Sequence, residues 1–185
     1  MVISSRVEMN HLFEPVMNVK TILSGFKHPW FIAGGWAIDL HLNRVTRAHD
    51  DVDIVVLKKY RKELQVFLLE TVFRGSVRLA KASQGVFPKH PAHFDIFTLE
   101  SDDDVCFLDK AKTIGLPLSM IGSCYAGGLP FLTPEIVVYF KARNTSSKDE
   151  RDFSNIVNHF NASCRQWLKQ VLQACYPDHP WLGKL

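Results

Sequence analysis

The residues best suited to chemistry lie in the segment 30–57, where His49, Asp51 and Asp53 are spaced two apart. Successive side chains of a strand point to opposite faces, so this spacing predicts all three on one face. Two carboxylates on one face repel each other unless a cation lies between them. Such a pair of hard oxygen ligands predicts a Mg²⁺ site, because proteins hold this ion by one or two carboxylates together with substrate phosphates.

A glycine turn precedes these acids. Gly34 and Gly35 follow the short apolar run 30–33 and open the segment 36–42, which has helical character. A strand that turns through glycine into a helix presents free backbone N–H groups and the positive end of the helix dipole, and this arrangement binds phosphate. Cationic or hydrogen-bonding side chains follow near the same edge: Arg44, Arg47 and His49.

A third acid, Asp95, stands alone in the apolar segment 93–99. The pattern predicts a central strand that carries one carboxylate inward. A buried carboxylate without a partner is unfavourable, so we expect Asp95 to be paired, bound to metal or acting as a base.

The stretch GGWAIDLHLNRVTRAHDDVDIVV resembles the signature of the antibiotic nucleotidyltransferases of the DNA polymerase β-like superfamily, in particular the aminoglycoside 2''-adenylyltransferases and the lincosamide nucleotidyltransferases. The resemblance implies an α+β nucleotidyltransferase fold, with a small mixed sheet flanked by helices and followed by C-terminal helices. It also implies that Asp51 and Asp53 hold Mg²⁺ and the nucleoside triphosphate, and that Asp95 completes the site as metal ligand or base. The matched positions, beyond the two glycines and two aspartates, are Trp36, Asp39, Arg44, Thr46, Arg47 and His49.

The function implied by this resemblance is transfer of AMP from ATP to a hydroxyl of an aminoglycoside or lincosamide, which would confer antibiotic resistance. The implied nucleotide-binding residues are Gly34, Gly35, Arg44, Arg47, His49, Lys141 and Lys148. His49 either orients the loop through a carboxylate or contacts phosphate, and for Asp39 we favour a structural role. The alternatives are a nucleotidyltransferase-fold toxin that modifies RNA or protein, and a pseudoenzyme that only binds nucleotide.

The acceptor is less clear from the residues. A polycationic aminoglycoside requires acidic groups, yet Phe97 follows two positions after Asp95. Only the acidic run Glu100, Asp102, Asp103 and Asp104 could compensate, and a solvated turn is the favoured reading of that run. A lincosamide or another hydroxyl compound therefore stays open.

Several elements must position these residues. Apolar spacing predicts helices over 8–26, with Pro15 in the first turn, and over 60–73. Alternation predicts a strand over 76–81, followed by a loop over 83–90. A hairpin is predicted within 119–132, turning at the glycines 127–128. We expect a catalytic core over 1–132 and a C-terminal helical segment over 133–185 that packs on it.

Capping patterns predict three C-terminal helices. Thr133 precedes Pro134 at the first helical position, Ser147 and Glu150 have capping-box spacing, and so do Ser163 and Gln166. Lys141, Arg143 and the Lys148-Asp149 pair, with Asp152, resemble the lysine and K-D-x-x-D elements that end the family's domain. For Asp149 and Asp152 we favour a simple helix-start role through the helix dipole.

The composition is that of a globular protein of one domain, with 46% hydrophobic and 22% charged residues among 185. A net charge of +3 is too small to argue for nucleic acid as a partner. The four cysteines lack metal-finger or C-x-x-C spacing, so buried or free thiols are expected. Without a signal pattern or a membrane-length apolar run, a cytoplasmic enzyme is the expectation, and the oligomeric state is open.

Overall fold

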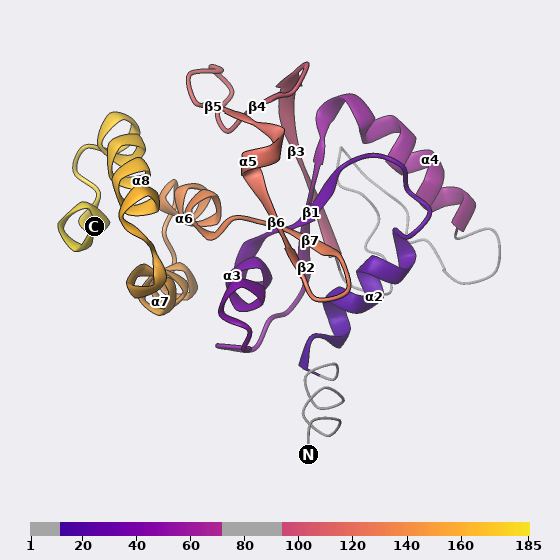
Figure 1. Ribbon diagram of the computed structural model, residues 1–185, viewed down its shortest axis with the longest axis horizontal. Coiled ribbons are helices and arrows are strands. Elements are labelled where there is room, and N and C mark those ends of the chain that lie inside the picture. Colours follow the sequence, from indigo (N-terminus) through magenta and orange to yellow (C-terminus); the bar gives the residue numbers. More distant parts are fainter. Residues whose placement is uncertain (1–11, 72–93) are drawn as a thin grey trace.

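A seven-stranded mixed sheet lies at the centre of the part of the chain that the computed structural model describes, residues 12–71 and 94–185 (Figure 1). The strands are β1 (Trp30–Ile32), β2 (Val52–Leu57), β3 (Phe94–Asp102), β4 (Val105–Phe107), β5 (Gly115–Pro117), β6 (Gly122–Tyr125) and β7 (Leu129–Leu132). Their order across the sheet is β5-β4-β3-β2-β1-β7-β6. The pairs β2–β3 and β1–β7 run parallel and the other neighbours run antiparallel. The predicted α+β class with a mixed sheet is therefore confirmed.

The hydrogen-bonded ladder of β2 begins at Val52, later than the sequence predicts. On one side β1 ends at Ile32, where the chain turns into a helix, and on the other side Val52 is paired with Phe94, the first residue of β3. No neighbouring strand among the described residues extends past this point. The prediction that His49 and Asp51 lie within the strand is therefore wrong, and both belong to the loop before it.

Helices cover both faces of the sheet. In Figure 1, α2 (Glu14–Ile22) and α4 (Arg61–Thr71) lie to its right, whereas α3 (Gly34–Leu42) and the C-terminal helices lie to its left. The remaining helical elements are η1 (Lys58–Tyr60), α5 (Leu118–Ile121), α6 (Pro134–Ala142), α7 (Ser147–Ile156), η3 (Val157–His159), α8 (Ala162–Cys175) and η4 (Pro180–Lys184). Helix α3 contacts both α6 and α7, so it joins the sheet to the C-terminal helices.

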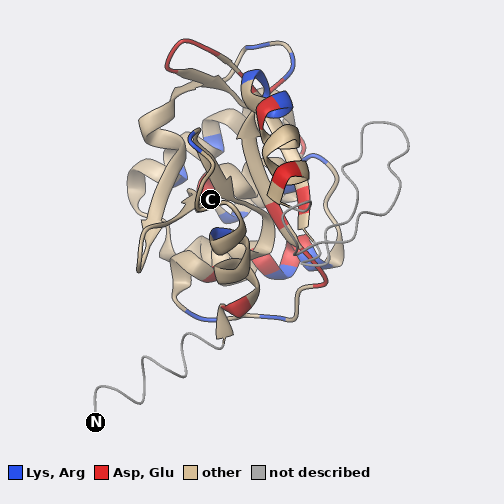
Figure 2. Cartoon of the chain, turned by 90° about the vertical axis from the view of Figure 1, so that its right-hand side faces the viewer, with Lys and Arg blue, Asp and Glu red and all other residues tan. Residues whose placement is uncertain are grey.

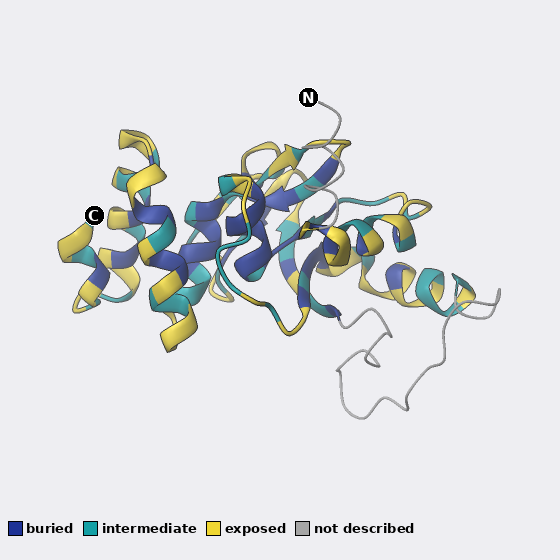
Figure 3. Ribbon diagram, turned by 90° about the horizontal axis from the view of Figure 1, so that it is seen from below, coloured by how far each residue is buried: buried dark blue, intermediate teal, exposed yellow. Residues whose placement is uncertain are grey.

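The hydrophobic core follows the sheet and the inner sides of the helices, and exposed residues occupy the outer turns (Figure 3). Val16 and Val19 of α2 and Leu64 of α4 are fully buried, as the apolar spacing of these segments predicts. Strand β2 contributes Ile54 and Val56 to the same core. Each such side chain contributes about 1.5–3 kcal/mol by burial.

The last described element, η4, packs on α7 through one aromatic side chain. Trp181 is fully buried, and its ring stacks on Phe153 with a centroid distance of 4.3 Å and an interplanar angle of 7°. Its indole Nε1 donates to Glu150 Oε1 at 2.9 Å. The end of the chain therefore supports the helix that also carries Asp149 and Asp152.

Three predicted helix caps differ in the structure. Thr133 occupies the N-cap of α6, but its hydroxyl makes no capping hydrogen bond and is buried without a partner. The capping box of α7 pairs Ser146 with Asp149, one residue before the predicted pair. Helix α8 is capped by Asn161, which accepts from the Cys164 N–H at 2.8 Å, and not by Ser163. Pro15 and Pro134 lie in the first turns of their helices as predicted.

The predicted hairpin is confirmed as β6 and β7, which turn at two glycines with positive φ, Gly127 and Gly128. The acidic run after Asp95 is not a simple turn, because Glu100 and Asp102 lie within β3. Only Asp103 and Asp104 form the connection to β4, and Asp103 has a φ of 48°. The four cysteines are free. The segments 76–81 and 83–90 lie outside the described residues.

Within the described ranges, none of the helices has both the length and the apolar character needed to cross a membrane.

Candidate active site

Two of the three predicted acids face each other across the parallel strands. Asp53 of β2 and Asp95 of β3 are paired in register, and both are half-buried. Residues opposite each other in neighbouring parallel strands point to the same face of the sheet. The structure therefore brings these two carboxylates together, from strands separated by a long segment of sequence.

The environment of Asp53 disfavours its charged form. Burial, followed by the charge of Asp51, raises the pKa of Asp53 to about 6, and the charge of Asp95 adds to the effect. Lys141 and Arg47 act in the opposite direction but do not cancel it. A carboxylate held this way, among other acids, is typical of a position that a cation neutralises.

Asp51 joins this group from the loop. Its side chain is exposed, and its carbonyl oxygen accepts a hydrogen bond from Trp36 Nε1 at 3.0 Å. Trp36 is buried on α3, so the helix fixes the loop just before the strand. The three predicted acids thus approach one end of the parallel pair, with Asp53 between the other two.

The glycine turn lies directly against these side chains. Gly34 has a φ of 59°, and a Cβ built on it would overlap the Asp53 carboxylate. A Cβ on Gly35 would overlap the guanidinium of Arg47 and the ring of His49. Glycine is required at both positions for close approach, and at Gly34 also for the backbone conformation. The start of α3 is therefore held in contact with the acids and the cations.

His49 is held by a buried carboxylate. Its Nε2 lies 2.6 Å from Asp39 Oδ2, both side chains are almost fully buried, and the ring stacks on Trp36 at a centroid distance of 4.4 Å. The other oxygen of Asp39 accepts from the N–H of Thr46 at 3.1 Å and from its hydroxyl at 2.6 Å. Asp39 therefore shapes the loop that leads to β2, in agreement with the structural role favoured from the sequence.

A charged network ties the same loop to the C-terminal helices. Arg47 donates two hydrogen bonds to Asp152, from Nε to Oδ1 at 2.8 Å and from Nη2 to Oδ2 at 2.9 Å. Lys141 of α6 contacts Asp152 Oδ2 at 2.8 Å and Asp149 Oδ1 at 2.6 Å. Burial opposes the charge of Asp152, but the hydrogen bonds from Arg47 and Lys141 outweigh it, and its pKa lies below the ordinary value.

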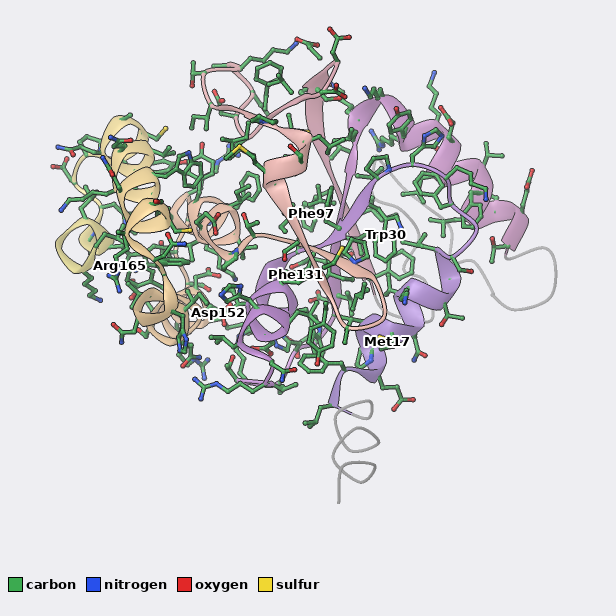
Figure 4. The ribbon with its side chains drawn as sticks, viewed as in Figure 1. Met17, Trp30, Phe97, Phe131, Asp152 and Arg165 are labelled. Carbon is green, nitrogen blue, oxygen red and sulfur yellow. The ribbon has the colours of Figure 1, made fainter. Side chains whose placement is uncertain are left out.

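This network corrects the interpretation of Asp152 as a helix-start residue. Its carboxylate is fully buried among side chains from two other parts of the chain, and Figure 4 shows it on the side of α7 nearest α3. The capping role belongs to Asp149 alone, which accepts from the Ser146 N–H at 2.9 Å. The bidentate geometry with Arg47 is typical of a positioning contact.

The other two predicted cations are placed differently. Lys148 forms an exposed ion pair with Asp50 at 2.6 Å, beside the loop that carries Asp51. The side chain of Arg44 is exposed and lines neither of the cavities described below. Of the predicted phosphate-binding residues, the structure therefore brings Arg47, His49, Lys141 and Lys148 to the glycine turn and leaves Arg44 outside.

Two cavities meet at Asp53. The smaller, of about 240 Å³, is polar and is lined by Gly35, His49, Asp51, Arg47 and Lys148, among others. The larger, of about 880 Å³, extends from Gly34 over the face of β2 and β3 towards α6, with Phe97 and Tyr139 in its lining. Asp53, Lys141 and Asp149 line both. A reaction centred on Asp53 would therefore have a polar chamber on one side and a partly aromatic one on the other.

The acids do not form a complete protein cage for a metal ion. Within residues 12–71 and 94–185, no three acidic, histidine or cysteine side chains are grouped closely enough to hold one by themselves. Mg²⁺ does not require such a cage, since it keeps waters and takes ligands from substrate phosphates. The exposed Asp51 and the half-buried, charge-crowded Asp53 fit this partial set of ligands.

The fold and the grouping of acids beside a glycine turn define a nucleotidyltransferase-fold protein. The solution structure of the antibiotic-resistance factor ANT(2'')-Ia matches with a TM-score of 0.61 at 18% identity, covering 94% of each chain. The crystal structure of lincomycin-bound LnuA, a lincosamide antibiotic adenylyltransferase, matches with a TM-score of 0.57 at 15% identity, covering 77% of this chain and 94% of that one. At these identities the likeness establishes a shared fold.

Sequence comparison makes the relationship more specific. The family model described as aminoglycoside-2''-adenylyltransferase matches residues 15–106, about half of the chain. The 2''-aminoglycoside nucleotidyltransferases of Escherichia coli and Klebsiella pneumoniae are 50% identical over 40 residues, which is 22% of this chain and 23% of theirs. The match thus spans less than a quarter of these curated relatives. Family model and fold together relate the chain to the antibiotic nucleotidyltransferases, as its motif suggests.

Two features of the site were not anticipated from the sequence. Asp152 was identified as part of a motif, but its pairing with Arg47 joins residues 105 positions apart, and no local pattern indicates it. Tyr139 and Phe140 line the larger cavity, whereas their apolar spacing in the sequence indicates only the buried stripe of a helix. The signal available for Asp152 was its charge on the otherwise apolar inner side of α7, next to the buried Phe153.

Proposed function

We propose that the protein transfers a nucleoside monophosphate, AMP from ATP, to a hydroxyl group of a small acceptor of the aminoglycoside or lincosamide type. The observation that carries this proposal is the in-register pair Asp53 and Asp95 beside the Gly34 turn. The relationship to antibiotic nucleotidyltransferases supports the reaction class. The proposal includes Mg²⁺, for which Asp51 and Asp53 are the ligands.

The reaction is an in-line displacement at phosphorus. The acceptor oxygen forms a bond to the α-phosphorus, the bond from that phosphorus to the bridging oxygen of the β-phosphate breaks, and pyrophosphate leaves. When bound, Mg²⁺ neutralises charge on the phosphate oxygens and on the leaving group. Asp51 and Asp53 contribute the carboxylate oxygens that hold the ion, and the raised pKa of Asp53 marks where positive charge is needed.

The polar cavity suits the triphosphate. Gly35 and Trp36, at the N-terminal end of α3, line this cavity, and the N–H groups of a helix start are suited to bind phosphate. Arg47 and Lys148 add positive charge. His49 is fixed by Asp39, so its ring is oriented before any ligand binds. Arg44, exposed and away from both cavities, is not included in this proposal.

Asp95 receives the proton of the acceptor hydroxyl. It lies on the same sheet face as Phe97 and Leu99, which line the larger cavity, and it is paired with Asp53. Asp95 is not itself part of that lining, but its in-register neighbour Asp53 is, so an acceptor bound in the cavity would bring its hydroxyl next to the acid pair. Removal of the proton as the new bond forms is general-base catalysis.

The proposal is tested by incubating the purified chain with α-labelled ATP and Mg²⁺ together with aminoglycosides, lincosamides and total RNA. We expect label on a small hydroxylated antibiotic and release of pyrophosphate. Label on RNA or on protein would instead assign the chain to toxin-like modification. Nucleotide binding without transfer to any member of the panel would indicate a pseudoenzyme.

A further inference from the structure

We propose that the acceptor is an amphipathic hydroxyl compound with at most one positive charge, which lays its apolar face on Phe97. This inference rests on the proposed function, and it specifies the acceptor class that the larger cavity selects. It separates the two acceptor types, because aminoglycosides are polycations and a lincosamide such as lincomycin carries a single amine.

The floor of the larger cavity is apolar. Val55, Phe97 and Leu99 lie on the same face of β2 and β3, next to the acid pair, and all three line the cavity. Val55 and Leu99 are buried, but Phe97 is 53% exposed. An aromatic ring exposed inside a cavity is a ready contact for an apolar surface of a ligand. Figure 4 shows Phe97 at the sheet, on the side of α5 and α6.

The charges that line this cavity balance. Among the described residues, the acids are Asp53, Glu100, Asp109 and Asp149. The bases are Lys58, Lys110, Lys141 and Arg143. A site that selects a polycation needs an excess of negative charge, because complementary potential determines specificity. Four acids against four bases give no such excess, and Asp95, which lies beside Asp53 outside this lining, adds a single further carboxylate.

Three of these four acids are also already engaged, and the fourth, Asp53, is the proposed Mg²⁺ ligand. Glu100 is paired with Lys58, and Asp149 lies 2.6 Å from Lys141. Asp109 accepts from the Thr113 hydroxyl at 2.9 Å and from the Ile114 N–H at 2.7 Å, so it shapes its own loop. A polycation would have to displace these partners, and the lysines freed in the process would repel it.

The acidic run next to the cavity does not supply the missing charge. Of the four acids of this run only Glu100 lines the cavity, and Asp102 is paired with Lys112 at 2.6 Å. Lys59 adds a positive charge beside Asp103, to whose backbone carbonyl it donates at 3.3 Å. On the side of the molecule drawn in Figure 2, basic and acidic residues are interspersed along helices and loops. The interpretation of the run as a negative rim for an aminoglycoside is therefore not supported by its partners.

The test measures acceptor binding and acceptor modification separately. Binding of lincomycin and of tobramycin to the full chain is measured by titration calorimetry without nucleotide, for the wild type, Phe97→Glu and Lys58→Ala. We expect the wild type to bind lincomycin at least about tenfold more tightly than tobramycin. Phe97→Glu should weaken lincomycin binding by about tenfold or more, because it replaces the apolar floor by a charge. Lys58→Ala frees Glu100 and should strengthen tobramycin binding.

Met120→Glu is the matched control. Met120 is 60% exposed, lines neither cavity and undergoes the same change of apolar side chain to carboxylate. The inference is overturned if the wild type binds tobramycin as tightly as lincomycin, if it binds neither, or if Phe97→Glu and Met120→Glu behave alike. Should lincomycin bind as expected but take no label from ATP, the acceptor class stands and the proposed transfer fails.

Discussion

Arg47 and Asp152 form a two-point ion pair that joins the loop before β2 to helix α7, although they are 105 positions apart in the sequence. Lys141 shares the same buried carboxylate. The cations nearest the glycine turn are therefore held by the C-terminal helices, and the site is formed only when both parts of the chain are packed.

The first prediction concerns this pair. Asp152→Asn leaves Arg47 partly buried without its counter-charge and leaves Lys141 with Asp149 alone. We expect the substitution to lower the free energy of unfolding by about 3–5 kcal/mol. Asp50→Asn is the control, because its pair with Lys148 is exposed and its loss should change stability far less. Urea titrations measure the free energy of unfolding of both variants. Equal losses would mean that the buried pair contributes no more to stability than the exposed pair.

Asp53→Asn should abolish transfer and leave the fold intact. The substitution removes a ligand charge at nearly constant volume, so circular dichroism should be unchanged while label transfer from ATP disappears. The variant should also be more stable than the wild type at neutral pH without ligands, because it no longer carries a carboxylate whose ionisation is disfavoured. Near-native turnover in this variant would contradict the metal-binding role.

The same residue predicts a pH dependence of stability. The pKa of Asp53 rises from 3.8 to about 6 on folding, so the folded protein binds this proton more tightly than the unfolded chain does. Ionisation of Asp53 then lowers the free energy of unfolding as the pH rises through this interval, by roughly 1 kcal/mol between about pH 5 and about pH 7. Thermal or urea unfolding at both pH values, compared with Asp53→Asn, isolates this contribution. An identical pH slope in the two proteins would exclude it.

Gly34→Ala should damage the site more than the fold. The new Cβ would meet the Asp53 carboxylate, and the positive φ adds about 1–2 kcal/mol of strain. Gly128→Ala is matched, since its φ is 78° and nothing lies near the added Cβ. We expect both variants to lose stability but only Gly34→Ala to lose transfer activity. Equal activity in the two would show that the close approach of Gly34 to Asp53 has no catalytic importance.

Asp95→Asn should reduce kcat by at least about a hundredfold if Asp95 is the base. The pH–rate profile should change with it, although Asp53 still contributes to the acidic limb. Asp102→Asn, an exposed acid farther along the same strand, should keep both rate and profile. Recovery of the rate at high Mg²⁺ concentration would instead assign Asp95 to the metal, and an unchanged profile would count against the base.

Local patterns were sufficient to predict the central elements. The order of strand, glycine turn, helix, loop and strand over 30–57 is confirmed, because glycine, apolar runs and acidic residues each restrict the backbone over a few positions. The extent of β2 was not predictable in this way. Its ladder begins where the neighbouring strands provide partners, and this depends on residues such as Phe94 that are distant in the sequence.

The caps of α7 and α8 show a second limit of local reasoning. The segment 145–150 contains several residues that accept hydrogen bonds, and both Ser146 with Asp149 and Ser147 with Glu150 satisfy the capping-box spacing. The packing of α7 on α3, which buries Asp152 and Phe153, decides which of the two pairs forms the capping box. The role of Asp152 escaped prediction for the same reason, because its partners lie in other elements.

The site also depends on η4, because Trp181 of that element stacks on Phe153 of α7. Phe153 directly follows Asp152 in the sequence. By stacking on Phe153, Trp181 of η4 therefore supports the part of α7 whose Asp152 binds Arg47. Disruption of η4 would loosen α7 and weaken the contact of Asp152 with the Arg47 guanidinium. We expect such a change to weaken nucleotide binding, although the altered residues do not contact the substrate.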